Sequence, residues 1–178
     1  MSTVTQWGVD PLHSEVQFKV KHLVISTVTG AFNSFSGGAV SKDGSLEGAE
    51  VHFTIDVNSI DTNQSQRDEH LRAGDFFDTT NHPQITFKST SFTKVKGDLY
   101  KLVGDLTIKG VTKSVEVDAE YGGTAKDAWG NTKIGFEVTG KINRKEFGLT
   151  YNAVTETGGL ALGEDIKLIA NIQLAEVA

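Results

Sequence analysis

The sequence contains no cysteine, and no long apolar run occurs anywhere along its 178 residues. Without cysteine the chain forms no disulfide, carries no thiol nucleophile and offers no thiolate ligand for zinc. No segment approaches the ~18 apolar residues that a membrane-spanning helix needs. The residues after Met1 also lack the basic start and the apolar stretch of a secretory signal. With Met1 taken as a translation start, we expect the protein to be cytoplasmic.

Positive charge is scarce as well. Lys and Arg number 17 against 23 Asp and Glu, so the net charge is -6. A surface of this sign repels phosphate backbones, which argues against nucleic-acid binding. The five histidines are scattered and show none of the close spacings that mark metal sites, so we expect no metal and no cofactor. They are His13, His22, His52, His70 and His82.

The dominant pattern is an alternation in which every second residue is apolar. In the first long segment Val16, Phe18 and Val20 are apolar, whereas Gln17 and Lys19 between them are polar. This period of two is typical of a β-strand with one buried face. It recurs near residues 29–40, 51–57, 85–92, 99–108, 115–121, 134–142 and 166–174. Turn residues lie at 42–44, 97–98, 109–110, 121–123 and 129–131, so we predict about eight antiparallel strands.

One stretch departs from the alternation. Residues 63–72 contain good helix formers, with Gly74 just beyond, which predicts a short helix in a crossover. The strands themselves admit two arrangements. An eight-stranded barrel has an interior that side chains fill or that holds one ligand, while a two-layer sandwich packs the same faces without a cavity. Periodicity alone does not distinguish them.

Four blocks of residues resemble the YceI-like, polyisoprenoid-binding family. They are residues 10–18 with 22–23 and 30–32; 67–71 with 75–78 and Pro83; 106–113; and 142–144 with 147–149. The blocks occur in the order that the family shows, and the resemblance extends from Trp7 to Leu174. It implies a single domain over residues 1–178, an all-β, eight-stranded antiparallel lipocalin-like barrel with one helix. It also implies an isoprenoid chain in an apolar tunnel, no established catalysis, and a homodimer. Many members are secreted to the periplasm, whereas this chain shows no signal segment.

The candidate tunnel residues are the side chains that the alternation turns inward. Ordinary core packing would explain any one of them, so the hypothesis depends on the whole set. His22 continues the inward positions of its strand and is either a hydrogen-bonded core residue or a ligand contact. The set is Phe18, Val20, His22, Phe53, Ile55, Phe87, Leu106, Phe136, Val138, Ile142 and Leu168.

Three basic side chains are candidates for contact with a polar head group. Arg67 is the first, with His13 and Arg144 beside it, because a guanidinium suits phosphate oxygens. The alternative is architectural: the two arginines would pair with carboxylates and fix the helix and the last loops. The carboxylates available for that role are Asp75, Asp78 and Glu69.

These observations predict a non-enzymatic protein that binds, stores or transports a long isoprenoid lipid, either a polyprenyl lipid or an isoprenoid quinone. A fatty acid or fatty amide would fit the same tunnel. One alternative is an enzyme on a lipid-like substrate, with His13, His22 or Arg67 as its polar groups. Another is a structural protein whose barrel is filled by its ten phenylalanines. Ser14 lies beside His13, but neighbours in a strand point to opposite faces, so we predict no catalytic residue.

Overall fold

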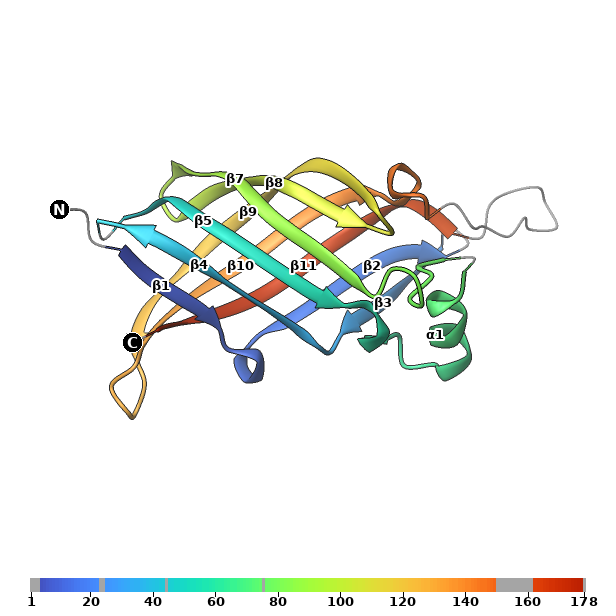
Figure 1. Cartoon of the computed structure of the whole chain (residues 1–178), viewed down its shortest axis with the longest axis horizontal. Helices are drawn as coiled ribbons and strands as arrows, with labels where there is room; N and C mark the ends of the chain where they lie inside the picture. The colour runs from blue at the N-terminus through green and yellow to red at the C-terminus, as the bar shows by residue number, and fades with distance from the viewer. Residues whose placement is uncertain (1–3, 23–24, 44, 75, 150–161, 178) are drawn as a thin grey trace.

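The computed structural model describes residues 4–22, 25–43, 45–74, 76–149 and 162–177, and within them the chain is almost entirely β-structure (Figure 1). One α-helix, α1 (Ser65–Arg72), and three short 3-10 segments at Pro11–His13, Val57–Ser59 and Arg144–Phe147 interrupt the strands. The strands are β1 (Val4–Val9), β2 (Glu15–His22), β3 (Ser26–Phe32), β4 (Phe35–Lys42), β5 (Ser45–Asp56), β6 (Ile60–Asp61), β7 (Gln84–Lys96), β8 (Leu99–Ile108), β9 (Val111–Lys126), β10 (Thr132–Asn143) and β11 (Leu162–Glu176).

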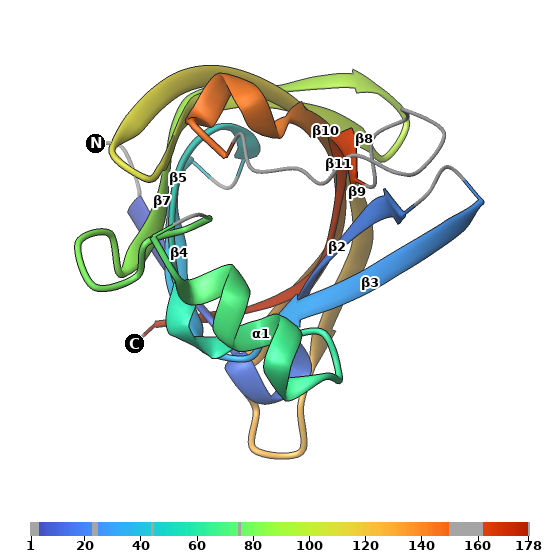
Figure 2. The ribbon, with the colours of Figure 1, turned by 90° about the vertical axis from the view of Figure 1, so that its right-hand side faces the viewer.

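Eight of these strands form a closed antiparallel ring in the order β1, β4, β5, β7, β8, β9, β10 and β11. The ring closes where β1 pairs with the end of β11, with Trp7 opposite Glu176 and Val9 opposite Leu174. Figure 2 shows the strands arranged around a common axis. The prediction of an eight-stranded antiparallel barrel is confirmed, and the sandwich that the periodicity left open is excluded.

The remaining strands extend the sheet at one end of the barrel. β11 pairs with β2 along its first part and with β1 along its last, and β2 continues to β3 and then β6. Helix α1 lies at this end, on one side of the ring of strands (Figure 2). It begins at Ser65 rather than at residue 63, because Asn63 has a left-handed backbone with a φ of 65° and Gln64 caps the helix by accepting from the Arg67 N–H.

Two details of the strand prediction are wrong. The segment 29–40 is two strands, because the chain breaks at Asn33 and Ser34, whose backbone groups bond to Ser59 and Asp56 instead of to a strand. The turn predicted at 121–123 lies inside β9. There Gly123, with a φ of 120°, sits where the pairing with β10 shifts register, so the glycine makes a bulge and not a reversal. The chain reverses after β9, at residues 127–131.

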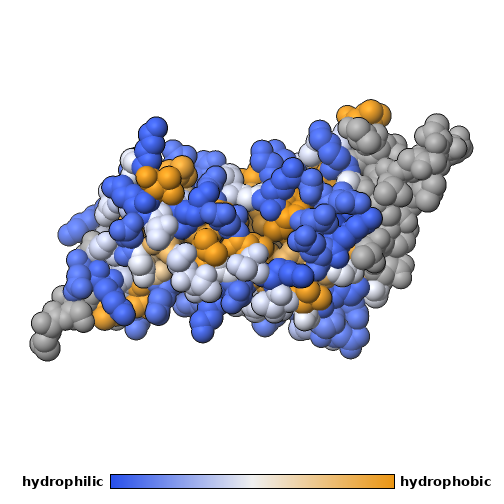
Figure 3. Space-filling view, turned by 90° about the horizontal axis from the view of Figure 1, so that it is seen from above, coloured by the Kyte–Doolittle hydropathy of each residue, from blue (hydrophilic) through white to orange (hydrophobic). Residues whose placement is uncertain are grey.

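The inward faces of the strands form the core, and on the face that Figure 3 shows hydrophilic residues surround smaller apolar areas. Buried apolar residues form one cluster near α1 and two more toward the opposite end. No helix in the described part of the chain is both long and apolar enough to cross a membrane.

Candidate ligand-binding cavities

The barrel encloses two cavities that follow one another along its axis. The inner cavity, of about 220 Å³, lies in the half away from α1 and has an apolar wall. The outer cavity, of about 320 Å³, lies beneath α1 and includes the polar residues Thr62, Arg67, His70 and Arg144. Ligand pockets generally have volumes of about 300–1,000 Å³, so the two together offer the space of a ligand site.

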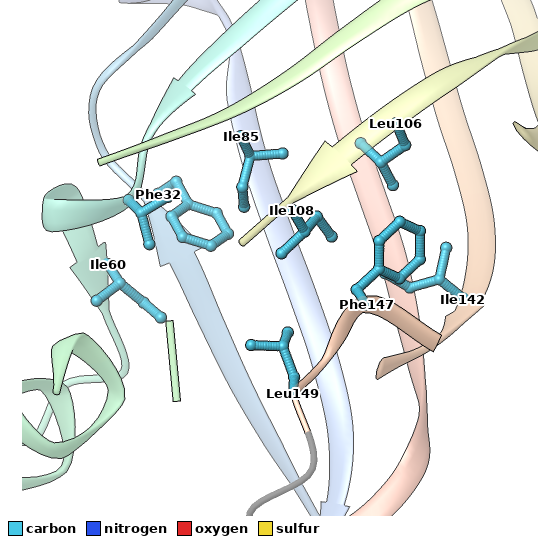
Figure 4. Packing of buried hydrophobic residues seen from close by; sticks show 9 residues of the cluster. Phe32, Ile60, Ile85, Leu106, Ile108, Ile142, Phe147 and Leu149 are labelled. Carbon is cyan, nitrogen blue, oxygen red and sulfur yellow. The ribbon is translucent and has the colours of Figure 1, made fainter. Parts of the chain in front are cut away.

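Five side chains line both cavities and form what we call the waist: Phe32, Ile85, Ile108, Ile142 and Leu168. They come from β3, β7, β8, β10 and β11, so strands from all around the barrel contribute. In Figure 4 Phe32, Ile85 and Ile108 point toward one another. The waist therefore divides one lengthwise interior into two chambers.

The alternation placed almost all of the predicted tunnel residues on these walls. Six of them line the inner cavity: Phe53, Ile55, Phe87, Leu106, Phe136 and Val138. Phe18 and Val20 line the outer cavity, while Ile142 and Leu168 belong to the waist. The side chain of His22 lies outside the described residues, so its predicted role stays a prediction.

Trp7 and Ser41 form a polar pair in the wall of the inner cavity that sequence reasoning missed. The Trp7 indole Nε1 donates a hydrogen bond of 3.1 Å to Ser41 Oγ, and Ser41 is only 3 % exposed. Because the indole N–H has this partner, Trp7 can present its ring to the cavity without a buried unsatisfied donor. A serine at an inward position of a strand was the available signal, since Ser41 follows Ala39 by two residues.

Arg67 stands at the polar side of the outer cavity and is held by a single neighbour. Its Nε donates to Thr62 Oγ1 at 2.7 Å, and its Nη2 donates to the Thr62 carbonyl at 2.6 Å. Asp68 holds the same threonine from the other side, since its Oδ1 accepts from the Thr62 N–H and hydroxyl. The expected ion pair of Arg67 with Glu69 or Asp78 is therefore wrong, because backbone and hydroxyl oxygens take the place of a carboxylate. Asp75 lies outside the described residues.

Arg144 is almost completely buried, with 2 % of its surface exposed. Its Nε donates to the Gly163 carbonyl at 2.8 Å, and its Nη1 donates to the Leu149 carbonyl at 2.6 Å. Burial lowers the pKa of the guanidinium below its ordinary value, although the nearby Glu164 raises it in part. These bonds fix the segment after β10 to the start of β11, while the side chain also forms part of the outer wall.

His13 lines neither cavity. It ends the 3-10 segment between β1 and β2, its side chain is 64 % exposed, and its Nδ1 lies 2.8 Å from Asp10 Oδ2. Asp10 also accepts from Lys133 Nζ at 3.1 Å. Together the His13 and Lys133 hydrogen bonds lower the pKa of Asp10 to about 2. The prediction placed His13 near a head group, whereas the chain turns outward at Pro11 and leaves it on the surface.

A closed antiparallel barrel with an apolar lengthwise interior and polar groups at one end defines a small ligand-binding β-barrel, the architecture that lipocalins also have. The model of the YceI-like domain matches residues 7–174, and the chain belongs to the YceI-like family.

Relatives and solved structures agree with this assignment. A UPF0312 protein of Staphylococcus aureus is 37 % identical over 97 % of this chain and 98 % of its own length. The Campylobacter jejuni YCEI protein superposes with a TM-score of 0.77 and 37 % identity, covering 89 % of this chain and 90 % of the other. A polyisoprenoid binding domain from Saccharophagus degradans superposes with a TM-score of 0.73 at 16 % identity, covering 96 % and 98 %. That last likeness shows the fold alone.

Proposed function

We propose that this protein binds a long isoprenoid lipid as a non-enzymatic carrier. The observation that carries the proposal is the pair of adjoining cavities that share the waist, the inner one apolar and the outer one mostly apolar with four polar residues in its lining. Such an interior suits a ligand with a long tail and a small polar end. The binding activity in the name of the Saccharophagus degradans domain, which shares this fold, supports the same ligand class.

The energetics are consistent with recognition through the tail. Burying one CH₂ group gains ~0.8 kcal/mol, so each five-carbon isoprene unit contributes roughly 4 kcal/mol before the costs of association. Those costs are estimated at about 4–15 kcal/mol, which means that a few buried units already give net binding. A polar anchor is therefore not required for affinity and would instead set the orientation of the ligand.

We place the polar end of the lipid in the outer cavity. Arg67 lines this cavity, is only half-buried, and directs the described hydrogen bonds of its side chain to Thr62 alone. A quinone carbonyl or a phosphate oxygen would find N–H donors there. If Arg67 contacts the head group, Arg67→Gln weakens binding of geranylgeranyl phosphate more than binding of geranylgeraniol; an equal loss for both would leave Arg67 with a purely architectural role.

Two other functions are distinguished from the carrier, one by the interior and one by the fate of the ligand. A structural protein filled by its own phenylalanines would leave no space, whereas the inner cavity of about 220 Å³ remains beside Phe53 and Phe87. A fatty acid or fatty amide occupies the same cavities and is a variant of the proposal. An enzyme on a lipid-like substrate would return a changed ligand, whereas a carrier returns it unaltered.

The decisive experiment is native mass spectrometry of protein purified from its own host, followed by extraction and identification of the released molecule. We expect a stoichiometric isoprenoid. A released fatty acid or amide would change the proposed ligand class, and the proposed carrier function would stand. An empty barrel that gains no thermal stability from added geranylgeraniol would refute it.

A matched pair of variants connects binding to the inner cavity. Val138 lines that cavity, and its neighbour Glu137 in β10 is exposed. Val138→Phe occupies part of the cavity and should strongly weaken tail binding, whereas Glu137→Phe adds the same side chain to the outside and should leave binding intact. Equal affinities for geranylgeraniol in the two variants would place the ligand elsewhere.

Two further predictions stay predictions. They are the homodimer, which light scattering on the purified protein tests, and the cytoplasmic location, which fractionation of host cells tests.

A further inference from the structure

Gly30 in β3 faces Phe18 in β2, and the two form a direct cross-strand pair. Gly30 is buried in regular extended strand, and its φ is not in the left-handed region, so its backbone conformation does not require glycine. Glycine weakens a strand interior, where it often marks a close approach by another group. The reason for glycine at this position must therefore be space.

The space belongs to the phenylalanine ring. A Cβ added at Gly30 would lie 2.2 Å from Cζ, 2.6 Å from Cε1 and 2.9 Å from Cε2 of Phe18, and these are its three nearest atoms. Ordinary van der Waals contacts are 3.4–4 Å, so a methyl group here forces the ring to move away by about 1 Å. The ring of Phe18 thus lies flat against the glycine and rests on the barrel wall.

The Phe18 ring lies between two neighbours and the outer cavity. Phe32 packs against it with ring centroids 5.4 Å apart, and Leu168 is its cross-strand neighbour in β11. Both neighbours belong to the waist, and the open side of Phe18 is the outer cavity. A displaced ring therefore enters the outer cavity beside the waist and narrows the route by which a chain reaches the inner cavity.

We infer that Gly30 is a specificity-determining position: by seating the Phe18 ring against the wall, it keeps the route beside the waist wide enough for a methyl-branched chain. This inference rests on the proposed function. It adds to that function a residue that sets which chains the interior accepts, although Gly30 contributes no side chain to the wall.

The test compares two saturated alcohols, phytanol and hexadecanol, which have main chains of the same length and differ in the methyl branches of phytanol. Affinities are measured by titration calorimetry for the wild type and for Gly30→Ala. We expect Gly30→Ala to lower the affinity for phytanol about tenfold more than that for hexadecanol. Gly135→Ala is the matched control, because Gly135 also lies in a barrel strand but an added Cβ meets nothing within 4 Å. The control should leave the ratio of the two affinities unchanged.

Two further variants separate the width of the route from general stability. Gly30→Ala combined with Phe18→Leu should restore the ratio, because the smaller side chain removes the clash. Phe18→Leu alone creates no clash at Gly30, and it should raise the affinity for phytanol relative to that for hexadecanol. An equal loss for both alcohols in Gly30→Ala, or an unchanged ratio in Phe18→Leu, would overturn the inference. A wild type that binds neither alcohol would instead overturn the proposed function.

Discussion

Helix α1 lies at one end of the barrel, and the buried carboxylate of Asp68 is one of the groups that fix it there. Asp68 is 6 % exposed, and its Oδ1 accepts from the Thr62 N–H at 2.9 Å and from the Thr62 hydroxyl at 2.6 Å. Thr62 directly follows β6, so these two bonds tie the helix to the sheet. We predict that replacing Asp68 with alanine loosens this end of the barrel.

The magnitude follows from the contacts. A hydrogen bond to a charged group contributes roughly 1.5–3 kcal/mol, and a buried donor left unsatisfied costs about 1–3 kcal/mol. Asp68→Ala removes both bonds and leaves the Thr62 N–H without its acceptor. We therefore expect the free energy of unfolding to fall by about 3 kcal/mol, which for a chain of this size lowers Tm by roughly 6–12 °C. Asp68→Asn keeps an acceptor oxygen and should cost about 1 kcal/mol.

Urea unfolding followed by circular dichroism measures all three proteins, with Glu69→Ala as the control because Glu69 is the exposed next residue of the same helix. The expected order of destabilisation is Asp68→Ala, then Asp68→Asn, then Glu69→Ala. If Asp68→Ala unfolds within about 0.5 kcal/mol of the Glu69→Ala control, a difference typical of neutral surface changes, the helix is held by other contacts and the reasoning fails.

Three further predictions concern charged and cavity-lining groups. The pKa of Asp10 is lowered from 3.8 to about 2, so the stabilisation by its carboxylate is present above about pH 4 and is lost as the pH falls toward 2. We therefore expect Asp10→Asn to be less stable than the wild type by about 1 kcal/mol at neutral pH. Urea titrations should show the two proteins equally stable near pH 2. Arg144→Lys should lower the free energy of unfolding by about 2 kcal/mol, because a lysine cannot reproduce the two guanidinium bonds to buried carbonyls, and an unchanged urea midpoint would contradict this. Val138→Phe should raise Tm in the absence of lipid by filling the inner cavity, while Glu137→Phe should not; differential scanning calorimetry of delipidated protein decides between them.

The sequence predicted the strands well because each has a wet and a dry face, and that difference is written into every second residue. It could not choose a barrel over a sandwich, since both bury the same faces. That choice depends on the pairing of Trp7 with Glu176, which joins the two ends of the chain and leaves no local pattern. The turn predicted at Gly123 was wrong for a related reason. Whether a glycine makes a bulge or a chain reversal depends on the register of the partner strand, which the local sequence does not contain.

The apolar part of the candidate site was predictable for the same reason as the strands. Ten of the predicted residues line a cavity because inward position in a strand and position on the wall are the same property. The division into two chambers was not predictable, since the waist brings together Phe32, Ile85 and Ile142 from distant parts of the chain. Contacts of the arginines were missed as well: charge suggested carboxylate partners for Arg67, whereas the structure supplies Thr62.

The two-residue alternation around the closed ring has a consequence for how such a protein can change. Each strand carries two interleaved sets of residues, one facing the interior and one facing water, as Val138 and Glu137 illustrate. Substitutions in the first set alter what the interior accepts, and substitutions in the second alter solubility, charge and contacts with other molecules. Ligand specificity and surface properties can therefore be redesigned separately on one scaffold.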